Sequence, residues 1–390
     1  INSDQEAINE RDGYMVNLLL NFDLSDSASL KSVTSFQNMD RFLRDDLDST
    51  DANLFGQNNY TEESDSFGQE FIFNYDASNY NLLAGVMYFE EELFGEVFVP
   101  LTNICFLLAP DLCGTETGDA FNSGKYLQDG DVDIEAYGAY AELTYNFSDQ
   151  WTVIAGLRYN YEEREGTGSF IFAPLQPDID TDAKDDWDDW TPRLTLQYSP
   201  NENLMLYATY TEAFKSGAIN TGSPSPPVNP ETVDAFELGL KGSSADGGMR
   251  YSLTAFYYDY QDLQVSFVDE NSVVATVNAA EAENYGAEFE ISAALGGGFI
   301  LDFYGTYLSA EYEEFVNRDY ANGFAVADLK GQTLPNAPEY TAKLGVTWDT
   351  VWGNGTFRAQ GEASYSDEVY FRVGKGIDAC LGSCEWCTGS

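Results

Sequence analysis

The chain has 390 residues, of which 66 are acidic and 18 are basic, so its formal net charge is −48. This balance argues against a nucleic-acid partner, since phosphate binding needs clustered Lys and Arg, and it disfavours docking on an anionic lipid surface. Histidine is absent, which excludes catalytic triads and metal sites that depend on imidazole. We therefore expect neither enzyme activity nor a cofactor.

Aromatic residues make up 15% of the chain, including 26 Tyr and 26 Phe, which argues against disorder. No uninterrupted apolar run is long enough for a transmembrane helix. A transmembrane β-strand remains open, because its signal is alternation rather than high mean hydropathy.

Alternation of apolar and polar residues with a period of two recurs along most of the chain and predicts strands. In 137–147, for example, Tyr137, Leu143 and Phe147 share one face, while Glu142 and Thr144 occupy the other. Fourteen strands are predicted, most of them about the length that crosses a bilayer with tilt. The predicted strands are 14–24, 29–37, 68–76, 80–92, 134–147, 151–162, 190–199, 203–213, 234–242, 249–264, 284–294, 298–312, 338–348 and 355–366.

The connections between these strands alternate between short and long. The short ones are rich in Ser, Asp, Asn and Gly, as tight turns require. The long ones fall near 38–67, 93–133, 163–189, 214–233, 265–283 and 313–337. This order is typical of an up-and-down barrel with turns at one rim and loops at the other, so the fold class is an all-β, antiparallel transmembrane β-barrel. The alternative is a large soluble β-protein that buries the same faces against a second sheet.

Five segments resemble the barrel of TonB-dependent outer-membrane receptors, in the order in which that family has them. They are YATYTEAFKSGAIN at 207–220, PETVDAFELGLKG at 230–242, YSLTAFYYDYQDLQV at 251–265, NAAEAENYGAEFEISAAL at 278–295 and LPNAPEYTAKLGVTW at 334–348. The resemblance covers about residues 14–366 and implies active transport across the outer membrane. Its implied partners are outer-membrane lipid, a TonB-type energy-coupling protein and a ligand, most often a ferric siderophore.

The resemblance implies a 22-stranded barrel with a plugged lumen, of which about 14 strands are predicted here. We therefore expect residues 1–366 to be part of such a barrel, without the plug, the first strands and the last ones. Residues 367–390 form a tail of different character with Cys380, Cys384 and Cys387. These spacings could suit a metal or redox site, but an appended tail is the better interpretation because a fourth ligand is not obvious.

Six basic residues are predicted to face the lumen and are candidates for contact with an anionic ligand. They are Arg158, Arg193, Lys241, Arg250, Lys343 and Arg358. The alternative is a solvated wall in which each pairs with neighbouring Glu or Asp. No residue is a candidate for catalysis or metal binding.

Cys105 and Cys113 lie eight residues apart in one of the long connections. In an oxidising compartment they would close a small disulfide loop, and two buried free thiols are the alternative.

One long connection is conspicuously acidic between Asp178 and Asp189. Asp178, Asp180, Asp182 and Asp189 fall on positions 1, 3, 5 and 12 of a calcium-loop pattern. Position 6, however, is Ala183 where the pattern needs Gly. A solvated acidic loop is the better interpretation.

Three other functions stay open at this point. A receptor of the same family could carry another cargo, such as cobalamin, haem or an oligosaccharide. A passive porin needs no plug, although the long loops argue against it. A secreted β-rich binding or adhesion protein would remain soluble without detergent, whereas a membrane barrel would not.

Overall fold

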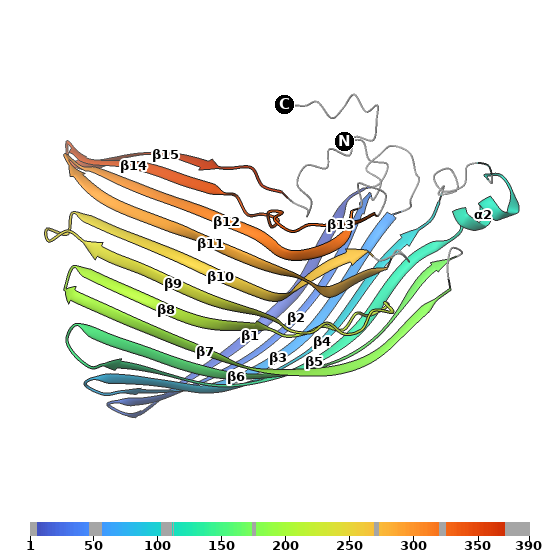
Figure 1. The fold of residues 1–390 in the computed structure, drawn as a ribbon, viewed down its shortest axis with the longest axis horizontal. Helices are drawn as coiled ribbons and strands as arrows, with labels where there is room; N and C mark the ends of the chain where they lie inside the picture. Colours follow the sequence, from blue (N-terminus) through green and yellow to red (C-terminus); the bar gives the residue numbers. More distant parts are fainter. Residues whose placement is uncertain are drawn as a thin grey trace.

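The computed structural model describes residues 6–46, 57–102, 111, 113–173, 177–268, 273–319 and 325–370. These residues form a single antiparallel sheet in which consecutive strands are hydrogen-bonded in chain order (Figure 1). The strands of the main path are β1 (Ile8–Ser25), β2 (Ala28–Asp46), β3 (Gln57–Asp76), β4 (Tyr80–Pro100), β5 (Lys125–Asn146), β6 (Trp151–Ala173), β7 (Ile179–Asn201), β8 (Leu204–Lys215), β9 (Glu231–Ser243), β10 (Met249–Val268), β11 (Val274–Gly296), β12 (Phe299–Asp319), β14 (Tyr340–Trp352) and β15 (Gly355–Ser366). A short strand, β13 (Ala325–Asp328), pairs with the end of β12, and one helix, α2 (Glu116–Asn122), precedes β5.

All fourteen predicted strands are present, and the predicted up-and-down order is confirmed. The predicted boundaries were wrong at the loop rim, where strands such as β5, β6 and β7 run on by about a third to a half of their length. Much of the predicted loops 93–133 and 163–189 is therefore strand. These extensions were missed because acidic, polar and glycine residues interrupt the alternation on both faces, and the apolar residues occur only in short groups such as 170–172.

The tight turns all lie at one rim of the sheet and use residues that suit their backbone. Gly298, between β11 and β12, has φ +84°, and a Cβ built on it would lie 1.8 Å from the Asp349 carbonyl oxygen. Only glycine fits such a close approach. Between β9 and β10, the Ser244 hydroxyl and the Gly248 N–H both donate to Asp246 Oδ1, and they lower the pKa of that carboxyl.

The Asp246 turn gives a prediction about pH. Because the folded-state pKa of Asp246 lies below its unfolded value, its stabilisation is present above the unfolded pKa and is lost as pH falls through the folded pKa. In folded protein extracted from the outer membrane, Asp246→Asn should lower the thermal midpoint near pH 7, and the effect should be smaller near pH 3. An equal effect of the substitution at both pH values would contradict this account.

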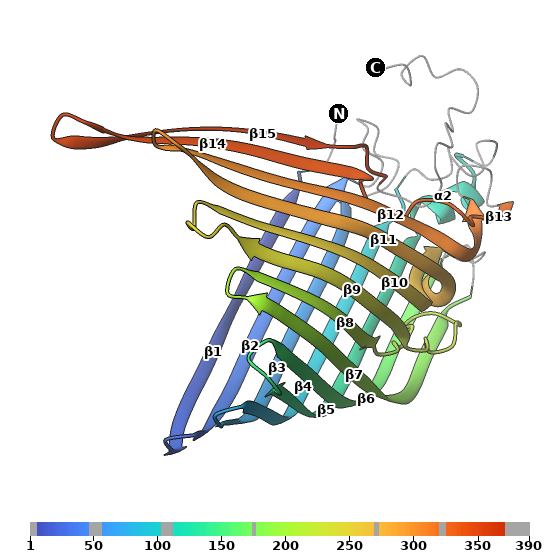
Figure 2. The same cartoon turned by 60° about the vertical axis from the view of Figure 1, so that its left-hand side comes forward.

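The sheet is strongly curved, and its two outer strands have free edges. Figure 2 shows β1 and β15 at opposite ends of the curved sheet, and within the described residues they do not pair with each other. Almost every residue of β1 and every residue of β15 is exposed. In hydrocarbon each unpaired backbone group would cost several kcal/mol, so these edges need partners in a membrane.

We therefore expect the 390-residue polypeptide, refolded alone into detergent, not to form a closed, heat-resistant barrel. The measurement is migration on a cold electrophoretic gel with and without boiling. A compact band that shifts on heating would show that the edges are satisfied after all.

Buried apolar residues are few and lie mainly at the loop rim. The cluster comprises Ala280, Ala282, Tyr312, Phe315 and Leu329. Elsewhere large apolar side chains are exposed; Leu238, for example, is 65% exposed. In water this exposure would be unfavourable by about 25 cal/mol per Å² of apolar surface, whereas against lipid it has no such cost. No helix in the described part of the chain is long and apolar enough to cross a membrane.

Candidate functional site

The register divides every strand into two faces of different chemistry. Paired residues lie on the same face, so Tyr137 shares a face with Tyr88 on β4 and with Tyr161 on β6. We call this apolar side the outer face and the opposite side the inner face. The inner face is the concave one, because loop 216–230 crosses it and connects strands that lie far apart in the sheet.

Two rows of aromatic rings follow the outer face. One row passes from ring to ring across β2 to β6 with centroid separations of 4.9–6.3 Å: Phe36, Phe67, Tyr88, Tyr137 and Tyr161. The second lies near the turns and includes Phe147, Trp151 and Tyr198, which stack in sequence. On β6 the two rows are ten residues apart, which is about 34 Å along the strand and, with a tilt near 40°, about 26 Å in height. This spacing matches the apolar band of an outer-membrane barrel.

Beyond the first aromatic row, towards the loop rim, the outer face becomes acidic. Neighbouring strands present Asp65, Glu92, Asp133 and Glu165 in register, and Lys184 pairs with Glu163 and Glu165. A hollow of ≈680 Å³ lies among these side chains. In the described part of the chain, no group of three or more acidic or cysteine side chains is placed to hold a metal ion.

The acidic segment 178–189, expected to be a solvated loop, lies almost entirely on strand β7, and this geometry also argues against the alternative of a calcium loop. Asp180, Asp182 and Asp189 lie on the extended strand β7, where Asp182 and Asp189 face opposite sides of the sheet. They are seven residues apart, about 24 Å along the strand, and so they cannot surround one ion.

All six predicted lumen cations lie on the inner face, but half of them are neutralised by a neighbour. Arg193 pairs with Glu142 at 3.4 Å, and Lys343 pairs with Glu362 at 2.9 Å. Arg358 donates two hydrogen bonds to Asp349, at 2.6 and 2.8 Å. These three residues therefore form part of a solvated wall in which each cation pairs with a neighbouring carboxylate, as the alternative to ligand binding expected.

The other three cations have no carboxylate partner within the described residues. Arg158 is nevertheless held in place, since it donates to Asn160 Oδ1 and Met87 Sδ and lies 5.4 Å from the ring centre of Tyr140. Lys241 lies 5.7 Å from the ring centre of Tyr207. Together with Arg250, Lys241 is the cation best placed to meet a ligand.

Two hollows of the inner face meet at Lys241. The upper one, ≈550 Å³, begins beside the ends of loop 216–230 at Thr211 and Val233 and descends to Lys241. The lower one, ≈720 Å³, continues from Lys241 past Arg250 to the turns. Tyrosines line this groove and satisfy their hydroxyls on the wall; Tyr258, for example, donates to Glu237 at 2.9 Å. The groove is therefore polar and mixed in charge along its length.

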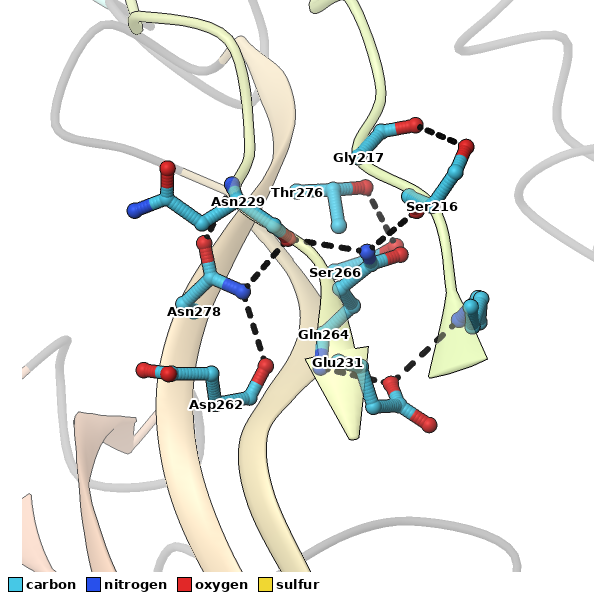
Figure 3. Close-up of polar contacts among 10 residues, drawn as sticks. Ser216, Gly217, Asn229, Glu231, Asp262, Gln264, Ser266, Thr276 and Asn278 are labelled. Atoms are coloured by element: carbon cyan, nitrogen blue, oxygen red, sulfur yellow. Dashed lines mark hydrogen bonds and ion pairs between the residues drawn. The ribbon is translucent and has the colours of Figure 1, made fainter. Parts of the chain in front are cut away.

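Loop 216–230, which we call the inner loop, folds over the upper end of this groove. Sequence reasoning placed 214–233 among the exposed long loops, but Ser216, Asn220 and Ser223 are all less than 9% exposed. Four amide side chains, none of them a predicted site residue, tie the loop to other segments. Gln128, Gln264 and Asn278 donate to backbone carbonyls of the loop, and Asn220 donates from the loop to the Thr276 carbonyl. Figure 3 shows the contacts of Gln264 and Asn278. In the sequence, the only feature that set this loop apart was the Gly- and Asn-containing end of the segment at 207–220, which resembles the family.

Of the five cysteines, only Cys113 lies among the residues that the structure describes. Cys113 is disulfide-bonded, while Cys105 lies outside the described residues, so their pairing stays a prediction. Cys380, Cys384 and Cys387 also lie outside the described residues. β15 ends at Ser366, and the division between barrel and tail at that point remains a prediction.

A curved up-and-down sheet with an aromatic-bounded outer face and a polar inner wall defines an outer-membrane β-barrel protein. The family model described as "TonB dependent receptor-like, beta-barrel" matches residues 2–375. The chain therefore belongs to the TonB-dependent receptor family, and the outer membrane is its location. This confirms the family and the fold class expected from the sequence.

Relatives in this family include named siderophore receptors. Over 163 residues the chain is 26% identical to the ferric-pyoverdine M114 receptor PbuA of Pseudomonas sp. (strain M114), an alignment that covers 42% of this chain and 20% of the relative. Among solved structures, the ferric yersiniabactin uptake receptor FyuA of Yersinia pestis superposes with a TM-score of 0.75 and 16% identity, over 94% of this chain and 51% of that one. The siderophore receptor PiuA of Acinetobacter baumannii gives 0.70 and 18%, over 93% and 56%. The chain thus spans about half the length of these solved receptors.

The two faces give a prediction for adjacent residues of β6. Leu157 lies midway between the aromatic rows on the outer face, and Leu157→Arg should destabilise the membrane-inserted protein by about 2–4 kcal/mol. Gly156→Arg places the same side chain on the solvated inner face, where it would share Glu142 with Arg193, and should cost clearly less than Leu157→Arg. The measurement is urea unfolding in lipid vesicles, and equal losses for the two variants would contradict the assignment of faces.

Proposed function

We propose that this chain forms the wall of a receptor that imports a ferric siderophore across the outer membrane, driven by a TonB-type energy-coupling protein. The observation that carries the proposal is a pair of inner-face cations, Lys241 and Arg250, which line the groove and have no carboxylate partner among the described residues. The outer face is strongly acidic beyond the aromatic row, whereas the six predicted lumen cations all line the inner face. In a chain with only 18 basic residues, this placement favours an anionic ligand inside the barrel.

Relatives support the same cargo class. Those named above are receptors for ferric pyoverdine and ferric yersiniabactin, and they belong to the family of this chain. The long connections at the loop rim would face the cell exterior and capture the ligand, while the inner wall would line its path. The coupling protein would act through a plug region, as the resemblance implies.

The test of this function is iron-dependent uptake in the native cell. Deleting the gene should abolish growth on one ferric siderophore as the sole iron source, and the wild-type gene should restore it. Growth that is unchanged on a panel of ferric siderophores, but reduced on cobalamin, haem or an oligosaccharide, would assign a different cargo. Uptake that persists without the energy-coupling protein would favour a passive porin.

The role of the free cations can be tested separately. Lys241→Ala should raise the half-saturating ligand concentration by about 10- to 150-fold, because a charge-assisted hydrogen bond contributes about 1.5–3 kcal/mol. Arg358→Ala is the matched control, since its charge is already paired with Asp349 and exposed pairs contribute little. If both substitutions have the same effect, Lys241 has no particular role in binding.

A further inference from the structure

One tyrosine of the inner wall lies across the neighbouring strand. Tyr207 on β8 is paired with Gly239 on β9, and Gly239 is paired with Thr254 on β10, so the three residues form one row on the inner face. The Tyr207 hydroxyl lies 2.9 Å from Thr254 Oγ1 and shares a hydrogen bond with it. The tyrosine side chain is therefore fixed at its far end as well as at the backbone of its own strand.

Gly239 provides the room for this arrangement. A Cβ built on Gly239 would lie 2.5 Å from Cε1 and Cζ of the Tyr207 ring, which is closer than two such atoms can approach. The glycine is itself buried, although its strand neighbours are partly exposed. A glycine inside a strand often marks a place where another group comes close to the backbone, and here that group is the tyrosine ring.

Lys241 lies two residues further along β9, on the same face, and its Nζ is 5.7 Å from the centre of the Tyr207 ring. Its in-register neighbours, Met205 on β8 and Ser252 on β10, are both neutral. The next residue of that row is Glu290 on β11, two strand spacings away from Lys241, which is about 10 Å. An aromatic ring attracts a cation through its quadrupole and, unlike a carboxylate, brings no opposing charge. The lysine is thus held in place but not neutralised.

The same arrangement recurs at Arg158. Tyr140 on β5 is paired with Gly85 on β4, where a Cβ would lie 2.4 Å from Cζ of the tyrosine ring. The Tyr140 hydroxyl donates to Glu70 on β3 at 2.7 Å, and the Arg158 guanidinium lies 5.4 Å from the ring centre. In both places a tyrosine crosses a glycine to reach a polar group two strands away, and a cation without a carboxylate partner among the described residues lies on its ring.

We propose that Tyr207 is a positioning residue for ligand binding: its ring holds the Lys241 ammonium in the groove and leaves the positive charge available to an anion. A free lysine side chain has many rotamers, and ordering it when a ligand binds costs conformational entropy. Holding the side chain beforehand removes part of that cost. The inference rests on the proposed function in one respect, namely that an anionic ligand meets Lys241.

The first test is nuclear magnetic resonance of folded protein extracted from the outer membrane, with its lysines methylated by ¹³C-formaldehyde and a reductant. Methylation keeps the lysine charge. The methyl protons of Lys241 should resonate upfield of those of a lysine that pairs with a carboxylate, such as Lys343, because they lie over a ring face. Lys241→Arg removes the resonance and so identifies it. Tyr207→Phe should keep the upfield position, and Tyr207→Leu should abolish it.

Displacing the ring should have the same effect as removing it. Gly239→Ala, with Tyr207 unchanged, should move the Lys241 resonance away from its upfield position, because the added Cβ excludes the ring. Gly345→Ala is the matched control on the inner face of β14, since a Cβ there would lie 3.7 Å from its nearest neighbour, an ordinary contact.

The second test uses inorganic phosphate as the anion and follows the Lys241 resonance during a titration. Tyr207→Leu should raise the half-saturating phosphate concentration about 2- to 10-fold, because the ligand must then order the lysine itself. Tyr207→Phe keeps the ring and should change the value by less than about twofold. Tyr258→Leu is the matched control, since Tyr258 lines the same hollow but bonds to Glu237. Heat-modifiable migration on a cold gel shows which variants are folded.

Three results would overturn the proposal. The first is a Lys241 resonance at the position of Lys343 in the parent protein, and the second is an upfield position that survives in folded Tyr207→Leu. The third is phosphate that leaves the Lys241 resonance unmoved, or binds equally well to the parent and to Tyr207→Leu. The first needs no altered tyrosine, so a variant that fails to fold does not remove the test. No siderophore or transport is involved, so these results are distinct from failure of the proposed cargo.

Discussion

The structure depends on one constraint: each strand must present one face to lipid while its backbone hydrogen bonds are satisfied by its neighbours. Period-two alternation provides the two faces, and an antiparallel ladder provides the hydrogen bonds. From this follow the continuous aromatic rows, the large exposed apolar side chains and the strict chain order of the strands. The polar groups of the chain are thereby directed either into the lumen or beyond the membrane boundary.

Charge follows the same division. The acidic residues beyond the aromatic row lie outside the apolar band, where ions can screen their repulsion. The six predicted lumen cations lie inside, and half of them build the wall through ion pairs with Glu142, Glu362 and Asp349. What distinguishes Lys241 and Arg250 is the absence of such a partner among the described residues, and this can be recognised only when the neighbouring strands are known.

The fold was predictable from the sequence because its signal is local. Rows such as Tyr137, Leu143 and Phe147 reveal the strand, its outer face and its approximate depth without any knowledge of the neighbours. The extended ends of β5 to β7 were not predictable in this way, because they leave the membrane and lose their apolar row. The inner loop was harder still. Its Gly, Asn and Pro residues are typical of exposed loops, and only the tertiary contacts of Gln128 and Asn278 place it inside.

The contact between Gln128 and Val274 also has a consequence for the order of assembly. These residues are 146 positions apart, and the strands that bring them together are β5 to β11 in sequence. Contacts of such long sequence separation form only after the intervening chain has been ordered. The contacts of Gln128 with Thr221 and Val274 are therefore among the last in this region to form, and their formation reports that seven consecutive strands have paired in the correct register. A slip of one residue anywhere between β5 and β11 would move Gln128 or its acceptors to the other face, and these hydrogen bonds could not form.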